Sequence, residues 1–172
     1  VAIFPSAFLE SFGNLPSHPS RPSFSSLFLT FLWVGIVEEF FKYLAVRLTV
    51  YRSNEFNEVM DGMVYMISAA LGFAAAENVG YMLGFGFFVG FLRAILSYLG
   101  HVSFSAILGY YLGKAKIERK GSWLWIGFIW AISLHWLYDA FFVIGTVHSS
   151  LGFLFFGLMV WVFGLILTYF LS

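Results

Sequence analysis

Two adjacent glutamates, Glu38 and Glu39, lie in the middle of a long apolar stretch, and Lys42 follows them one helical turn later. An ionised side chain near the centre of a bilayer costs roughly 2.5–3.5 kcal/mol on insertion scales. Two neighbouring carboxylates also repel each other strongly where the dielectric constant is low. A single lysine on the same helix face cannot neutralise both. The pair therefore predicts further polar partners, and water, supplied by other parts of the chain.

Candidate partners occur in three later apolar stretches. Glu77 and Asn78 follow three alanines, and His101 follows a glycine. His135 and Asp139 are four residues apart, so both lie on one helix face, where the carboxylate fixes the imidazole tautomer and raises its basicity. A structural ion pair, an interfacial histidine or an interhelical hydrogen bond would explain any one of these residues alone. Their joint presence favours a common water-filled pocket, because none of them is tolerated against lipid.

Carboxylates and histidines together favour the activation of a water molecule. One carboxylate would take the proton as general base, while His135 with Asp139 donates to a developing oxyanion. The same kind of residues could bind zinc, with Glu77, His101 and His135 as the candidate ligands and one position left for water. Otherwise no cofactor is expected, and residue types alone leave both routes open. The sequence contains neither His-Glu-x-x-His nor Gly-x-Ser-x-Gly.

Composition places the chain in a lipid bilayer. Its 172 residues are 60% hydrophobic and 10% charged, whereas soluble domains contain about 25% charged residues. The formal net charge of zero argues against a nucleic-acid partner. The absence of cysteine excludes disulfides, thiolate catalysis and cysteine metal sites. We therefore expect an integral membrane protein.

The expected fold is an all-α polytopic membrane helix bundle of one domain. Residues 1–22 contain all four prolines and predict an irregular N-terminal segment. Residues 23–172 are predicted to form a single transmembrane helical domain with an intramembrane active site. About five spanning helices are expected from the long apolar stretches at about 24–51, 58–84, 101–114 with a basic extension to 120, 123–147 and 149–171. Asp61, near the start of the second stretch, is typical of a carboxylate at the positive end of a helix dipole.

The segment near residues 85–100 is predicted to be re-entrant or interfacial and not to cross the membrane. Arg47 and Arg52 end the first helix, and four basic residues end the third between residues 114 and 120. Cytoplasmic loops collect lysine and arginine, and both clusters fall on one side if 85–100 does not cross. At about 1.5 Å per residue, the candidate site residues then share the outer half of the bilayer. The predicted pocket opens to the outer side.

Several ordered motifs resemble those of the PrsW family of intramembrane proteases. The motifs are Glu38-Glu39-Phe-Phe-Lys42, Asp61-Gly62, Phe73-Ala-Ala-Ala-Glu77-Asn78, Gly100-His101, Gly109-Tyr110-Tyr111 and His135-Trp-Leu-Tyr-Asp139. More distantly, they resemble the CAAX prenyl protease and bacteriocin-immunity group, which has histidine where this chain has Glu77. The resemblance implies a prokaryotic cell-membrane endopeptidase, of glutamic type or a metalloprotease, acting on membrane-anchored substrates of the anti-sigma-factor class.

The motif positions give the expected site. Its catalytic residues are Glu38, Glu39, Glu77, His101, His135 and Asp139, with Lys42 and Asn78 in supporting roles. In the preferred mechanism Glu38 or Glu77 activates the water, and Lys42 neutralises Glu39. The alternatives are a membrane transporter or proton relay built on the same buried cluster, and a catalytically silent binding or scaffold protein.

Overall fold

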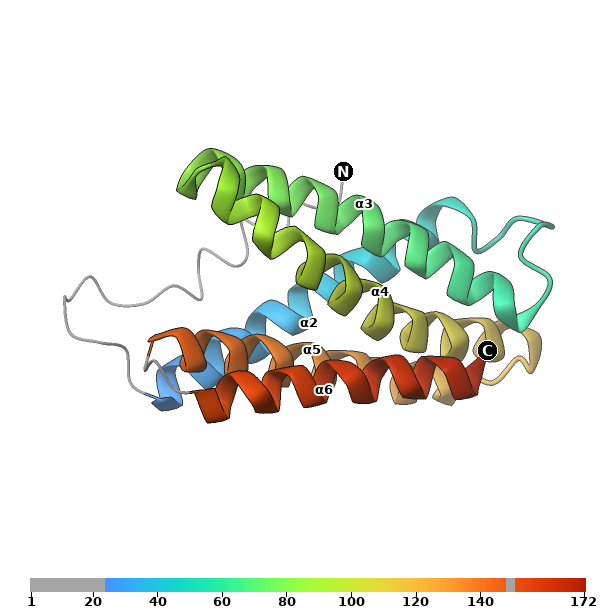
Figure 1. The fold of residues 1–172 in the computed structure, drawn as a ribbon. Helices are drawn as coiled ribbons and strands as arrows, with labels where there is room; N and C mark the ends of the chain where they lie inside the picture. Colours follow the sequence, from blue (N-terminus) through green and yellow to red (C-terminus); the bar gives the residue numbers. More distant parts are fainter. Residues whose placement is uncertain (1–23, 148–150) are drawn as a thin grey trace.

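The computed structural model describes residues 24–147 and 151–172, which form five helices and no strand (Figure 1). The helices are α2 (Phe24–Thr49), α3 (Val59–Phe85), α4 (Phe87–Ile117), α5 (Ser122–Val147) and α6 (Leu151–Leu171). The predicted all-α bundle is confirmed. The predicted irregular segment 1–22 lies outside the described residues.

Three stretches are long and apolar enough to cross a membrane: Val59–Gly84 in α3, Ser122–Phe142 in α5 and Leu154–Leu171 in α6. The other two helices, with 26 and 31 residues, exceed the roughly 20 residues that a crossing needs. They contain more charge, because α2 bears the glutamate pair and α4 ends on lysines. All five helices together fit a helical membrane bundle.

Helices α3 and α4 form an antiparallel pair, and α5 and α6 pack along α4 (Figure 1). Helix α2 packs mainly against α5 and to a smaller extent against α3. The α4 helix is central to both main apolar clusters. The first surrounds Met66 and Leu112, and the second surrounds Phe104 and Leu134. The buried polar residues of α4 therefore face other helices on two sides.

The predicted re-entrant or interfacial segment near residues 85–100 is not found as a separate element. Residues 87–117 form one continuous helix, and the break from α3 is confined to Gly86, whose φ of 94° costs a glycine little. The helix continues because no proline interrupts it and because helical hydrogen bonds satisfy each peptide group without water. The glycine and aromatic content of residues 85–100 thus predicted a longer interruption than the single residue Gly86.

The two basic clusters, after α2 and at the end of α4, were expected on one side, and the structure places them at one end of the bundle. Because α3 and α4 run antiparallel, the end of α4 returns to the turn that follows α2 (Figure 1). Lys116 Nζ donates to the carbonyl oxygen of Ser53 at 3.3 Å. Both Lys116 and Arg47 lie over the Tyr51 ring. The two basic clusters thus share one end of the bundle.

Asp61 has the helix-start role that its position predicts. Its Oδ2 accepts backbone hydrogen bonds from Asn57 at 2.9 Å and Glu58 at 2.7 Å. These N–H groups precede the first turn of α3, where donors lack intrahelical partners. Asp61 therefore stabilises the start of α3.

Glycines allow α3 and α4 to cross at backbone contact. A Cβ atom built at Gly62 would overlap the carbonyl oxygen of Gly109 and lie 2.7 Å from the amide nitrogen of Gly113. A Cβ atom at Gly109 would lie 2.8 Å from the Met63 Cα atom. Small residues permit such close approach between helices in lipid. This contact sets the distance between α3 and α4.

We predict that Gly62→Ala lowers the free energy of unfolding by roughly 1–3 kcal/mol, because the added methyl group overpacks the crossing. Gly72→Ala in the same helix is the matched control, since a Cβ atom there meets nothing within 4 Å. Unfolding of both variants in detergent micelles, followed by circular dichroism, measures the difference. Equal stabilities would contradict the backbone contact.

Candidate active site

Four helices bring the predicted site residues together. Helix α2 contributes Glu38, Glu39 and Lys42, α3 contributes Glu77, α4 contributes His101, and α5 contributes His135 and Asp139. The α2 residues and both histidines are buried. The side chains of Glu77 and Asp139 are 19% and 23% exposed. These two carboxylates therefore mark the more open edge of the cluster.

Glu39 is fully buried and is the anchor of the cluster. Its Oε1 accepts a hydrogen bond from Lys42 Nζ at 2.7 Å and lies 3.0 Å from His135 Nδ1. Its Oε2 accepts from Ser105 Oγ at 2.8 Å. An ionised carboxylate accepts hydrogen bonds and donates none. Both oxygens of Glu39 already have partners of this kind. Glu39 is therefore placed to orient its neighbours.

The His135 ring lies between two carboxylates. Its Nδ1 faces Glu39, and its Nε2 lies 3.3 Å from Asp139 Oδ2 and 3.7 Å from Glu38 Oε2. The i,i+4 contact with Asp139 that the spacing predicts is present. We assign the Nδ1 proton to the hydrogen bond with Glu39, because that oxygen cannot donate. Nε2 is then the nitrogen presented to both Asp139 and Glu38.

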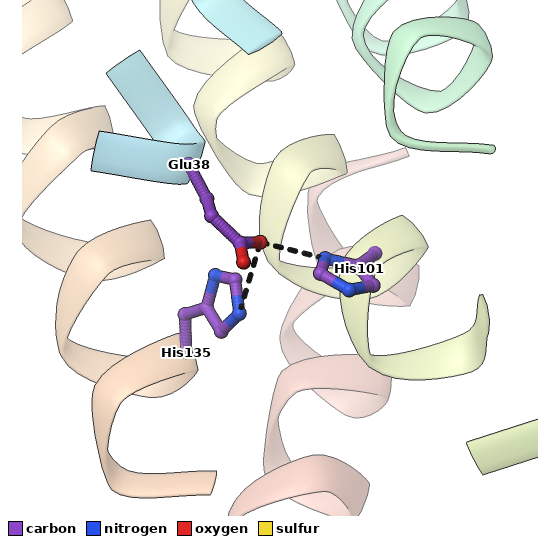
Figure 2. Close-up of side chains that lie close together, drawn as sticks. All are labelled: Glu38, His101 and His135. Atoms are coloured by element: carbon purple, nitrogen blue, oxygen red, sulfur yellow. Dashed lines mark ion pairs between the residues drawn. The ribbon is translucent and has the colours of Figure 1, made fainter. Parts of the chain in front are cut away.

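His101 shows the same arrangement on the opposite side of Glu38. Its Nε2 lies 3.0 Å from Glu77 Oε2. Its Nδ1 lies 2.7 Å from Lys42 Nζ and 3.6 Å from Glu38 Oε2. The two imidazoles meet edge to face with ring centroids 5.0 Å apart. Each histidine thus has one carboxylate behind it. Its other nitrogen faces Glu38 (Figure 2).

This donor set fits a divalent metal ion. One ligand atom each from Glu38, His101 and His135 lie within 4.8 Å of one another (Figure 2). One carboxylate and two imidazoles are ligands that zinc takes in catalytic sites. Glu77 and Glu39, behind the rings, are the outer partners that fix ligating histidines. The sequence predicted Glu77 as the carboxylate ligand, whereas here Glu38 joins the two histidines and Glu77 lies on the outer nitrogen of His101.

Four neighbouring side chains, two aromatic and two polar, surround these groups. The Phe73 ring centroid lies 4.8 Å from Lys42 Nζ, and the ring centroids of Phe104 and His135 are 5.8 Å apart. Ser105 was missing from the predicted site, although its position four residues after His101 places both on one face of α4. Asn78 is buried beside Glu77 on α3, and its supporting role stays a prediction.

The chain is similar to proteins of one family. Residues 1–168 match the family described as PrsW family intramembrane metalloprotease. A protein named Protease PrsW from Geobacillus kaustophilus is 41% identical over 111 residues, which are 63% of this chain and 49% of that protein. The proteins of the same name from Halalkalibacterium halodurans and Bacillus subtilis are 36% and 35% identical over 137 and 144 residues. These matches cover 78% and 81% of this chain and 64% and 65% of the two relatives.

The chain therefore spans between 49% and 65% of the length of these relatives. No solved structure shows significant similarity to it. The family match runs through every helix and through all the motifs that meet at Glu38. On these grounds the chain belongs to the PrsW family.

Proposed function

We propose that this protein is an intramembrane endopeptidase that hydrolyses peptide bonds of membrane-anchored proteins. The observation that carries the proposal is the convergence of both histidines on Glu38, with a second carboxylate behind each ring. Family membership supports the same activity. No contact in the described residues favours the transporter, proton-relay or scaffold alternatives over hydrolysis.

Glu38 is the carboxylate best placed to activate water. Glu39 is bonded to three donors, so it is a poor proton acceptor for a reacting water molecule. Glu38 Oε2 instead faces the inner nitrogens of His101 and His135. A water molecule hydrogen-bonded to Glu38 would lie beside both imidazoles. Glu77, which faces the more open edge, is the alternative base.

His135 is suited to stabilise the tetrahedral intermediate. In this role His135 is doubly protonated: Nδ1 donates to Glu39, and Nε2, beside the carboxylates of Asp139 and Glu38, holds the second proton and can donate to the oxyanion. A donor held in place before the reaction stabilises a developing oxyanion more in an apolar site than in water. The same ring can return a proton to the leaving amine. Asp139 acts through His135 in this scheme.

The residues Glu38, His101 and His135 would hold a zinc ion if the enzyme uses one. Bound there, the ion would polarise the scissile carbonyl group and acidify water. The family description names a metalloprotease, and we include the metal in the proposal. The carboxylate route through Glu38 needs the same residues, so substitutions at these positions do not separate it from the metal-dependent route. Chelators do, because only the metal-dependent route would lose activity.

The proposed site opens toward the outer side of a prokaryotic cell membrane. The shared basic end of the bundle would face the cytoplasm by the positive-inside rule. His101 lies about 24 Å from that end by helical rise, in the opposite half of a hydrocarbon core of roughly 30 Å. The substrate would be a membrane-anchored protein, with anti-sigma-factor-like proteins as the expected class.

Glu38→Gln is expected to reduce cleavage roughly 10²- to 10⁴-fold, because the amide cannot accept the proton from water. Glu77→Ala and His135→Ala should also abolish turnover without unfolding the protein. Glu55→Gln, in the exposed turn after α2, is the control and should retain activity. Cleavage of single-span reporter peptides with a fluorophore and quencher, in liposomes, measures the rates. Unchanged turnover in folded Glu38→Gln and Glu77→Ala would refute the assignment.

Removal of metal is the second test. We expect 1,10-phenanthroline to inactivate the purified protein and added Zn²⁺ to restore cleavage, because the ion would polarise the scissile carbonyl group and acidify the attacking water. The isomer 1,7-phenanthroline, which cannot chelate, is the matched control. Full activity in protein shown to be metal-free by elemental analysis would leave the carboxylate route as the mechanism.

Ser105→Ala is expected to lower kcat about ten-fold with little change in KM, since Glu39 loses a hydrogen bond and holds His135 less firmly. Ser105→Thr keeps the hydroxyl group and should recover most of the rate. Ser103→Ala is the control, because that hydroxyl group bonds the Leu99 carbonyl oxygen in its own helix. Equal kcat values for the two alanine variants would show that Ser105 does not position Glu39.

A further inference from the structure

Lys42 already occupies part of the candidate metal site. Its buried Nζ atom lies 2.7 Å from His101 Nδ1 and 3.5 Å from Glu38 Oε2. These two residues are among the three candidate ligands. The ammonium group also bonds Glu39 Oε1 at 2.7 Å. A positive charge of this chain therefore contacts the groups that a metal ion would need.

The contact with His101 uses the nitrogen that would bind the metal. The other ring nitrogen, Nε2, faces the carboxylate of Glu77, which accepts a hydrogen bond, so Nε2 holds the ring proton. Nδ1 then has a single lone pair, and Lys42 donates to it. That lone pair cannot accept a hydrogen bond and coordinate an ion at the same time. Lysine contact and metal coordination at Nδ1 exclude each other.

We propose that Lys42 is an internal cation that competes with the divalent metal ion for His101 and Glu38. The inference rests on the metal-dependent form of the proposed function. In the metal-free protein the ammonium group offsets part of the negative charge of Glu38 and Glu39 and holds His101 in place. Metal binding requires Lys42 to release Nδ1, so the lysine lowers the affinity of the site for the ion.

The surroundings of Lys42 allow this release without unfolding. Glu39 Oε1 is a separate partner of the ammonium group, and Glu39 is not among the three candidate ligands. The Phe73 ring, whose centroid lies 4.8 Å from Nζ, already makes a cation–π contact with the ammonium group. The charge of Lys42 thus stays paired after its bond to His101 is broken. In this proposal the exchange is a rotation of the Lys42 side chain.

The test compares metal affinity in the full chain, purified in detergent, with Lys42→Met and Lys114→Met variants. We expect Lys42→Met to bind Zn²⁺ and Co²⁺ at least about ten-fold more tightly than the unaltered chain, because no charged hydrogen bond must be broken first. Lys114→Met removes the same charge from a partly exposed lysine that pairs with Glu118, and its affinity should not change. Competition with a chromophoric chelator and the visible spectrum of bound Co²⁺ measure binding.

A second measurement uses the unaltered chain and does not depend on the folding of a variant. The sequence contains four histidines, and ¹⁵N-histidine spectra report both ring nitrogens of each. We expect Zn²⁺ to shift the Nδ1 signal of His101, assigned with His101→Asn, while Nε2 keeps its proton. Zinc binding with that Nδ1 signal unchanged would overturn the proposal.

Two other results would also overturn it: equal or weaker metal affinity in Lys42→Met, and failure of that variant to bind either ion. Cleavage by metal-free protein would then still support the endopeptidase. Conversely, tighter binding in Lys42→Met together with no cleavage by the unaltered chain would support the competition and remove the proposed activity. The two proposals therefore fail separately.

Discussion

The fully buried carboxylate of Glu39 is the constraint on which the bundle depends. Its partners are Lys42 on its own helix, Ser105 on α4 and His135 on α5. Removing one partner of a buried ion pair costs about 3–5 kcal/mol, because an uncompensated charge remains in an apolar interior. The rotation and depth of three helices are thus coupled to one side chain. A membrane protein has few other ways to specify register, because lipid and apolar side chains are equally hydrophobic.

The close crossing of α3 and α4 extends this arrangement to the open edge of the site. Backbone contact at Gly62 and Gly109 brings the two helices close together, and farther along the pair Glu77 reaches His101. The histidines then have different partners behind them but face the same oxygen of Glu38. Residues that pack the helices and residues that do chemistry are consequently linked along α3 and α4.

Helix α6 contributes packing and none of the site residues described above. Its Thr168 hydroxyl group bonds the carbonyl oxygens of Ser103 and Gly164, and its apolar side chains cover the cluster around Phe104. This cover excludes water from one side of His135, whose ring contacts Phe104. Low polarity there strengthens every interaction among the charges of the site. Because the site residues lie on α2 to α5 and α6 only packs against them, the motifs end with α5, while the apolar pattern continues through α6.

The sequence by itself determined the membrane setting, the helical class and the inventory of reactive side chains, because apolar length, charge content and i,i+4 spacing are local properties. It predicted the contact of His135 with Asp139 for this reason. Only the tertiary structure decided that Glu38 faces both histidines, that Ser105 bonds Glu39 and that Lys42 reaches His101. These contacts join residues on different helices, and their partners depend on how each helix is rotated and how closely the helices cross. At residues 85–100 composition predicted a segment separate from the third helix, whereas the structure interrupts the helical chain only at Gly86 and continues as α4 from Phe87. Composition cannot locate such a break, because backbone hydrogen bonding continues through glycine and aromatic residues alike.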